Sequence, residues 1–288
     1  MSNKNGDIDD DEIRIISSGT GEQTHKKRKT LIIRLCCMAA VLVIGCMAVM
    51  FMPAGDPAEE NTILPANPTQ TSDDGTPTND SVPTASPYVE RADTLVNGIR
   101  LVILTPHHAT PTLEIGSKTV EDSTAVLMAQ AADVRGDNGK IVGSFVVRGE
   151  LVSKGEAKAG FCSIANGAIS IGVADATPTF EQALMLDGYF FRQYPLVVAG
   201  QIIENKTKGR SIRKALAEID GRISVVVSGN NASYHDFSRA LVDAGVRNAI
   251  SLVGGGSYGR YTDSAGNTFV FGPEWDKKIE NVNYIVWR

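Results

Sequence analysis

One uncharged apolar run divides this chain into a lipid-compatible segment and polar segments on either side of it. The eighteen residues from Leu35 to Met52 read LCCMAAVLVIGCMAVMFM and carry no charge. With residues 31–33, and with Arg34 able to reach toward the lipid headgroups, the run is long enough to span a bilayer. The alternatives are a buried core helix and a cleaved signal peptide, which usually has a shorter apolar core and a small-residue cleavage site. We therefore predict a retained, single-pass transmembrane helix over 31–52.

Charges on the two sides of this run predict its orientation. Residues 26–29 are Lys-Lys-Arg-Lys, whereas no Lys or Arg occurs between Cys36 and Glu90. By the positive-inside rule, residues 1–30 are a cytoplasmic tail and the C-terminal bulk is extracytoplasmic, in a bacterial periplasm or at the cell surface. Residues 53–88 are rich in Pro, Thr, Ser, Asp and Asn, which predicts a disordered linker. Residues 89–288 have the size of one domain.

The exported part lacks the signatures of several protein classes. The net charge of −5 provides no basic surface for nucleic acid, and we expect no nucleic-acid partner. Three of the four cysteines lie in the apolar run, so Cys162 has no partner for a disulfide within the domain. We interpret Cys162 as a small core residue rather than a nucleophile. The sequence predicts no cofactor and leaves a requirement for a divalent cation open.

Short β-branched runs dominate residues 89–288 and predict strands. The stretch 212–219 fits a helix as well as a strand, but Asp220-Gly221 follows it and is a hairpin signal, which favours the strand. The other predicted strands are Ile99–Leu104, Ile141–Val147, Ile169–Val173, Leu196–Val198, Ile223–Val227, Phe269–Phe271 and Tyr284–Trp287.

Helix signals are fewer. Ser233 and Asp236 form a capping-box pattern before apolar residues at helical spacing, and Gly245 stands at the C′ position, which predicts a helix over 233–244. Further helices are predicted over 180–186 and 119–131. Many strands with two or three helices predict an α+β domain with a mixed, largely antiparallel sheet and a few packed helices.

The run Asn248 to Ser257, NAISLVGGGS, ends a predicted buried strand in three glycines and a serine. Without a Cβ, the backbone N–H groups of glycines can approach an anion closely. A tight turn without a ligand is the alternative reading. The run is not a phosphate-binding P-loop, because no Gly-Lys-Ser/Thr follows it.

The order of motifs resembles the phosphodiester glycosidase family, which includes the exported domain of the mammalian mannose-6-phosphate uncovering enzyme and many bacterial relatives. The resemblance covers roughly residues 142–271 and is strongest over 210–257. It rests on TFEQAL from Thr179, YPLVV from Tyr194, KGRSIRKALA from Lys208, DGRISVVV from Asp220, the capped helix and the glycine-rich strand end.

The resemblance implies a glycosidase that hydrolyses a sugar-phosphate diester or a related envelope glycan. It matches an Arg-Thr-Ala-like strand to Arg213-Lys214-Ala215, and a family motif Leu-Asp-Gly-Gly-Gly-Ser to residues 252–257. In this chain Val253 replaces the aspartate, and a valine neither binds a cation nor moves a proton. The alternative function is therefore a non-catalytic ectodomain that binds a glycan or a partner.

Cleaving a sugar-phosphate diester needs donors for phosphate oxygens and a carboxyl group for proton transfer. Arg210 could equally be a solvated loop charge, and Asn230 could equally be a turn residue. The aromatic residues beside Asp187 and Arg192 could pack in the core as well as stack on a sugar ring. Arg260 near the glycines is a further possible donor. The predicted catalytic acids are Asp187 and Asp133, and the predicted substrate-binding residues are Arg213, Arg210, Arg192, Asn230, Gly254, Gly255, Gly256 and Ser257.

Overall fold

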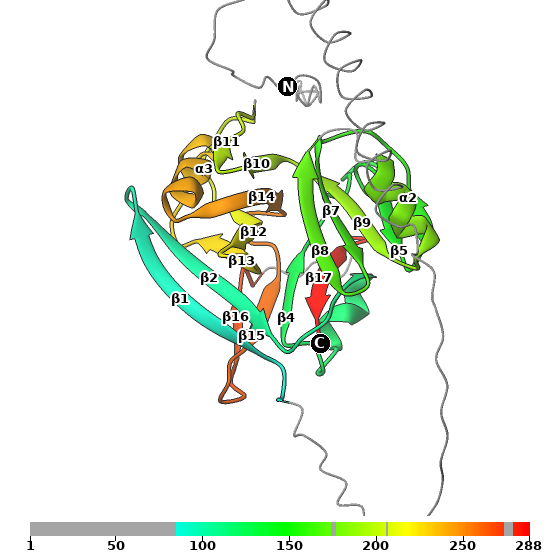
Figure 1. Ribbon diagram of the computed structural model, residues 1–288, viewed down its shortest axis with the longest axis horizontal. Helices are drawn as coiled ribbons and strands as arrows, with labels where there is room; N and C mark the ends of the chain where they lie inside the picture. Colours follow the sequence, from blue (N-terminus) through cyan, green and yellow to red (C-terminus); the bar gives the residue numbers. More distant parts are fainter. Residues whose placement is uncertain (1–84, 174–176, 206, 274–278) are drawn as a thin grey trace, which may run out of the picture. The chain divides into compact units, whose positions relative to one another are not determined.

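The computed structural model describes residues 85–173, 177–205, 207–273 and 279–288. The predicted cytoplasmic tail, the predicted transmembrane helix and residues 53–84 of the predicted linker lie outside these ranges. None of the helices within the described ranges is both long and apolar enough to cross a membrane. The α+β prediction is confirmed, since three sheets and few helices make up this part of the chain (Figure 1). Every strand pairing among the described residues is antiparallel.

The first sheet has seven strands in the order β1-β2-β13-β12-β14-β10-β11. Their bounds are β1 Tyr88–Val96, β2 Ile99–His107, β10 Pro195–Val198, β11 Gln201–Ile202, β12 Lys214–Ile219, β13 Arg222–Ser228 and β14 Val246–Leu252. The predicted hairpin is confirmed: Asp220 and Gly221 join β12 to β13 with φ of 50° and 72°. Two successive positive φ angles are what a two-residue type I′ turn requires.

The other two sheets have five strands each. The second has the order β16-β15-β4-β17-β3 and the third β6-β5-β9-β7-β8. Their bounds are β3 Pro111–Ile115, β4 Leu127–Gln130, β15 Gly259–Thr262, β16 Thr268–Phe271, β17 Asn283–Trp287, and β5 Phe145–Val147, β6 Glu150–Ser153, β7 Gly160–Ala165, β8 Ala168–Val173, β9 Tyr189–Gln193.

The predicted helix over 119–131 is wrong. This stretch contains the 3₁₀ helix η1 (Ser117–Glu121) and then strand β4, which lies between β15 and β17. Residues 125–129 are all buried. A strand buried on both faces has a continuous apolar run instead of an alternating one, so periodicity does not distinguish it from a buried helix.

Helix α3 (Tyr234–Asp243) forms as its sequence predicts. The Ser233 hydroxyl accepts a hydrogen bond from the Asp236 N–H, and Gly245 has a φ of 87° just beyond the C-terminus. Phe237 and Leu241 are fully buried against one face of the first sheet. Burial of side chains of this size stabilises a fold by about 1.5–3 kcal/mol each.

Alternation along β12 and β14 divides the first sheet between two cores. Ala215 and Ala249 face the α3 side, whereas Leu216 and Ile250 face the main core, to which all three sheets contribute. Cys162 is fully buried in this main core, as predicted, and burial raises the pKa of its thiol. The predicted helix over 180–186 is present as α2 (Thr177–Met185) and packs against β7 and β9.

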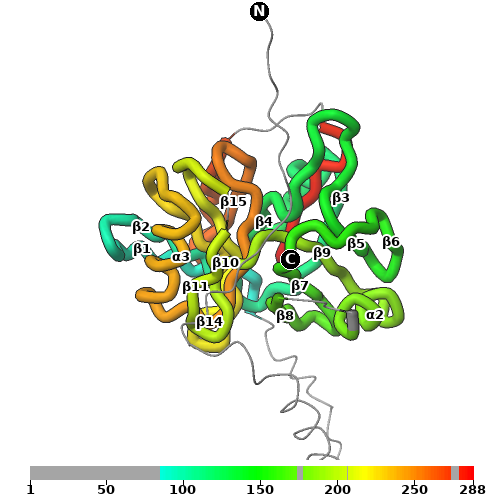
Figure 2. Tube along the Cα trace, turned by 90° about the horizontal axis from the view of Figure 1, so that it is seen from above, coloured from blue at the N-terminus to red at the C-terminus, as the bar shows by residue number. Residues whose placement is uncertain are grey.

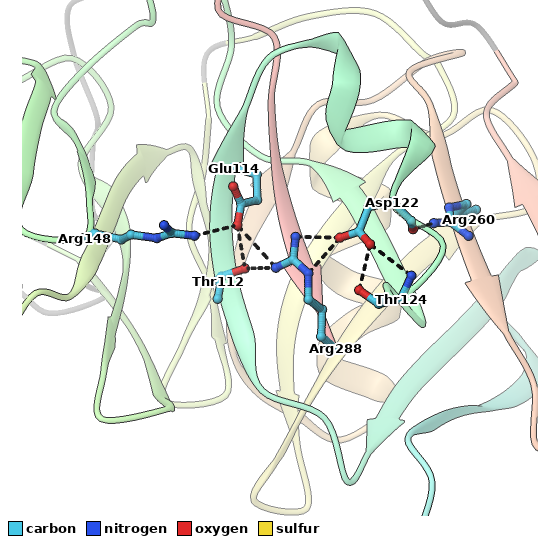
Figure 3. A network of polar contacts seen from close by, with 7 residues as sticks. All are labelled: Thr112, Glu114, Asp122, Thr124, Arg148, Arg260 and Arg288. Carbon is cyan, nitrogen blue, oxygen red and sulfur yellow. Dashed lines mark hydrogen bonds and ion pairs between the residues drawn. The ribbon is translucent and has the colours of Figure 1, made fainter.

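A charged network connects β3, the segment after η1, β15 and the residue after β17 (Figure 3). The Arg288 guanidinium donates to Asp122, with Nε and Oδ2 2.7 Å apart, and its Nη1 lies 3.2 Å from Glu114 Oε1. Burial alone would raise the pKa of Asp122, but hydrogen bonds from Thr124 and Arg288 outweigh it and hold the pKa below its usual value. Arg260 donates to the Asp122 backbone carbonyl. This contact directs the Arg260 guanidinium to the network.

The chain crosses from the third sheet to the first at a single residue. Tyr194 separates β9 from β10, and Figure 2 shows β9 on the side of α2 and β10 on the side of α3. The Tyr194 carbonyl accepts a hydrogen bond from Ser251 at 2.8 Å, which holds the crossing against the end of β14. The residues of chemical interest gather around this crossing.

Candidate functional site

Five side chains from separate segments meet where the first and third sheets adjoin. Each comes from a strand end, a helix start or a connection on a rigid scaffold, positions that often carry binding residues. We call them the Asp133–Arg213 cluster: Asp133 after β4, Lys158 before β7, Tyr194 between β9 and β10, Arg213 before β12, and Tyr234 at the start of α3.

The acidic end of the cluster is an ion pair between Asp133 and Lys158. The Lys158 ammonium donates to Asp133 Oδ2 and also lies 3.3 Å from Gln193 Oε1. The Lys158 side chain is 3% exposed and that of Asp133 is 39% exposed. A buried ammonium is costly unless it is paired, so the carboxylate and the amide oxygen compensate for its burial. The more exposed carboxylate keeps acceptor capacity toward solvent.

Two tyrosine rings connect this ion pair to Arg213. Lys158 Nζ lies 4.7 Å from the Tyr194 ring centroid, and the Tyr194 and Tyr234 centroids are 5.8 Å apart. The guanidinium carbon of Arg213 lies 3.9 Å from the Tyr234 centroid. Cations over aromatic faces at these distances are attracted by the ring quadrupole. The cluster therefore runs without a break from a carboxylate to a guanidinium.

Arg213 is held rigidly and is 8% exposed. Its Nε donates to the Ala232 carbonyl at 3.0 Å and its Nη2 to the Gly209 carbonyl at 2.9 Å. Within the described residues it has no carboxylate partner. A guanidinium has five N–H donors, so donors remain for a ligand. A largely buried cation with only neutral partners is suited to an anion.

Charges at both ends of the cluster shift the pKa of the Tyr234 hydroxyl. Burial raises its pKa, the Asp133 charge raises it further, and Ser251 and the Arg213 charge lower it. The net shift is upward, so Tyr234 is a neutral phenol at pH 7. Asp133 and Arg213, which the sequence places eighty residues apart, thus act electrostatically on one hydroxyl.

The glycine turn, Val253–Ser257, packs beside Arg213. The Gly255 N–H donates to the Ile212 carbonyl at 2.8 Å, and a Cβ on Gly254 would lie 2.8 Å from the same oxygen. This close approach explains the glycine at 254. The N–H groups of Gly254 and Gly256 have no hydrogen-bond acceptor among the described residues. They are therefore the two backbone donors that the turn offers to a ligand.

A buried lysine fixes the far end of the turn. Lys214 is 1% exposed, and its ammonium donates to the carbonyl and to the hydroxyl of Ser257, with Nζ and Oγ 2.6 Å apart. The Ser257 hydroxyl in turn lies 2.5 Å from the Val253 carbonyl. Ser257, predicted to bind substrate, thus also closes the turn.

The remaining predicted substrate-binding residues have structural contacts of their own. The exposed Arg210 guanidinium lies 2.7 Å from Asp236 Oδ2, and Asn230 accepts from the Arg100 N–H at 3.0 Å. Arg192 is 9% exposed and donates to the Lys158 carbonyl at 3.3 Å, so it supports the segment that carries the lysine. Their predicted contacts with substrate stay predictions.

The structure separates the two predicted acids. Asp187 precedes β9, whereas Gln193, which touches Lys158, ends it. Strand β9 alone has five residues, which correspond to about 17 Å of extended chain at roughly 3.3 Å per residue. Asp133 is therefore the predicted acid that lies in the cluster, and Asp187 lies at the opposite end of β9.

Sequence reasoning missed Lys158, Tyr194 and Tyr234 as site residues. Tyr194 and Tyr234 each carried a signal, because one precedes a proline between two buried strands and the other follows a helix N-cap. Lys158 had none, since one lysine in a polar loop is ordinary. The described residues contain no group of three or more His, Cys, Asp or Glu side chains that could hold a metal ion.

Comparisons with known proteins agree with the resemblance. The sequence profile of the phosphodiester glycosidase family matches residues 123–286, and no curated protein matches the chain. The catalytic domain of zebrafish N-acetylglucosamine-1-phosphodiester alpha-N-acetylglucosaminidase, auto-inhibited by its pro-peptide, is 15% identical with a TM-score of 0.49, over 72% of this chain and 84% of that one. A hypothetical protein from Synechocystis is 12% identical with a TM-score of 0.45, over 70% of this chain and 62% of its own. The family profile spans more than half of the sequence, and the chain belongs to the phosphodiester glycosidase family.

Proposed function

We propose that this protein hydrolyses the bond between a sugar and a phosphodiester in a glycan of the bacterial cell envelope or its surroundings. The observation that carries the proposal is the Asp133–Arg213 cluster. Within the described residues, it places a rigid guanidinium without a carboxylate partner and a partly exposed carboxylate at the two ends of one pair of aromatic rings. The guanidinium suits a phosphate, and the rings suit a sugar face.

The cluster supports a division of labour. Arg213, with the N–H groups of Gly254 and Gly256, binds the phosphate oxygens. Asp133 accepts a proton from a water molecule as the water oxygen bonds to the anomeric carbon. The bond between that carbon and the phosphate oxygen breaks, and the electron pair leaves with the phosphate, whose charge Arg213 stabilises.

This reaction needs one carboxyl group rather than two. Ordinary glycosidases pair a base or nucleophile with an acid that protonates the leaving oxygen. A phosphate leaves as a stable anion, so the acid is dispensable when donors stabilise the developing charge. Asp133 therefore provides the carboxylate that the resemblance led us to expect at position 253, where this chain has Val253.

The proposal includes the location of the enzyme. The apolar run over 31–52 and its basic flank support a single-pass anchor with a cytoplasmic N-terminus and an extracytoplasmic catalytic domain. Substrate then reaches the cluster from the periplasm or the cell surface.

The test is hydrolysis of a sugar-1-phosphodiester model substrate by the purified full-length protein. We expect turnover, and Asp133→Asn lowers kcat by about 100-fold or more, as expected for loss of a general base. Asp187→Asn is the matched control, because it makes the same change at the other predicted acid, and its kcat stays near that of the unchanged protein. Saturable glycan binding without turnover would contradict the proposal and identify a non-catalytic ectodomain.

A further inference from the structure

A cavity lies close to Asp133 and includes none of the five side chains of the cluster. It has a volume of about 310 Å³, at the lower end of the range for small-molecule sites. Three segments form it: the loop before β5, the end of β6 and the residue pair before β17. We call it the lysine pocket, and its lining residues are Lys140, Ile141, Val152, Ser153, Lys154 and Asn281.

The lysine pocket is cationic. Lys140 and Lys154 come from different segments, and neither ammonium has a hydrogen bond or an ion pair within the described part of the chain. Among the described residues, the lining includes no carboxylate. Glu280 is the neighbour of the lining residue Asn281, and a Cβ on Gly139 would approach its Oε2 to 3.9 Å. Two lysines from different segments in one lining, with one carboxylate nearby, favour an anionic ligand.

Backbone contacts fix the segments that carry these lysines. The Lys140 carbonyl accepts from the Arg135 N–H at 2.9 Å, and the Asn281 side-chain amide donates to the Gly139 carbonyl at 2.9 Å. Ser153 donates its hydroxyl to the Ile141 carbonyl at 3.0 Å, which holds the end of β6 against the loop. The backbone that carries the two lysines is therefore positioned before any ligand binds.

The same loop connects the pocket to the proposed site. Val134 pairs with Ile141 in an antiparallel bridge, and the Val142 N–H donates to the Asp133 carbonyl at 2.9 Å. Ile141, which lines the pocket, and Asp133, the proposed base, therefore lie in adjacent residue pairs of one short antiparallel turn. Adjacent antiparallel rungs are only a few ångströms apart.

We propose that the lysine pocket is a second anion subsite, which binds a further phosphate of a substrate whose scissile diester occupies the Asp133–Arg213 cluster. The inference rests on the proposed function and narrows the substrate to sugar-phosphate oligomers, or to diesters with a second phosphate on the leaving group. A substrate with one phosphate occupies the cluster alone.

Two sugar-1-phosphodiesters that differ by one extra phosphate on the leaving group test this in the full-length protein. Exposed ion pairs contribute weakly, so Lys140→Gln and Lys154→Gln should each raise KM for the two-phosphate substrate about threefold, and the double variant about tenfold. KM for the one-phosphate substrate and kcat for both should stay unchanged. Lys118→Gln, at an exposed lysine on η1, is the charge-matched control and should change neither KM.

Equal changes of KM for both substrates, or none for either, would overturn the subsite. Tripolyphosphate binding, measured by calorimetry on the full-length protein and the double variant, separates the two proposals. If neither substrate is hydrolysed but tripolyphosphate binds and the double variant loses about tenfold in affinity, the glycosidase proposal fails and the anion site stands. If tripolyphosphate binding is the same in both proteins, the anion site fails. The tenfold loss should shrink as salt is raised, because exposed charges are screened.

Discussion

Because Lys158 is more deeply buried than Asp133, substituting either residue alone should lower the free energy of unfolding by different amounts. Removing one partner of a fully buried ion pair costs about 3–5 kcal/mol, because the other charge stays buried without compensation. Asp133→Asn leaves the 3% exposed ammonium with an amide oxygen and an aromatic ring. Since the lost carboxylate is 39% exposed and partly screened by water, we reduce the expected cost to about 2 kcal/mol.

Lys158→Met should cost less, about 1 kcal/mol or below. The methionine fills the space of the lysine stem, and water can solvate the partly exposed Asp133 carboxylate. The double variant Asp133→Asn/Lys158→Met has no buried charge at this position, so its stability should return close to that of Lys158→Met. The coupling free energy between the two positions then equals the cost of Asp133→Asn in magnitude, about 2 kcal/mol.

Denaturant and thermal unfolding of the full-length protein measure these differences. For a domain of this size, a loss of 2 kcal/mol lowers Tm by about 4–8 °C. If Lys158→Met is as destabilising as Asp133→Asn, or if the double variant is the least stable of the three, the argument from burial is wrong. A coupling free energy near zero would show that the ion pair contributes nothing to the fold.

Four further substitutions should separate the effects of binding, backbone geometry and charge. Arg213→Lys should lower kcat/KM by about tenfold or more, because an ammonium replaces neither the two carbonyl contacts nor the planar stacking, and equal steady-state rates would contradict this. Gly254→Ala should reduce activity more than Gly255→Asn. The Cβ of an alanine at 254 would lie 2.8 Å from a backbone oxygen, whereas position 255 has open space and a φ of 61° that asparagine tolerates. The reverse order in the same assay would refute the assigned turn geometry. The lowered pKa of Asp122 means that its carboxylate stabilises the fold above pH about 4, the unfolded value, and that this contribution is lost as pH falls through the lower folded pKa. Asp122→Asn should therefore lower Tm at pH 7 and flatten the fall of Tm in acid, and an unchanged pH profile would refute the role of its ion pair with Arg288.

Local signals predicted the elements whose formation depends on neighbouring residues. The Asp220-Gly221 turn, the Ser233 cap and the glycine after α3 each meet a backbone requirement that a few adjacent residues satisfy. The helix prediction over 125–129 was wrong because these residues are buried by two strands distant in sequence, β15 and β17. The residues of this stretch fit a helix and a buried strand equally well.

The candidate site was predictable in part. Arg213 and the glycine turn were identified by motif, and Asp133 was one of two acids that the sequence did not rank. The position of β9 distinguishes the acids, because Gln193 at one end contacts Lys158 and Asp187 precedes the other end.

The sequence by itself determined the family, the β-rich character of residues 89–288, the capped helix and the glycine turn, because each depends on residues that are contiguous in the sequence. Tertiary structure alone decided that Asp133, Lys158, Tyr194, Arg213 and Tyr234 share one surface. Their contacts arise where one sheet passes into another at Tyr194. Such a crossing depends on the packing of whole sheets, for which no local pattern exists.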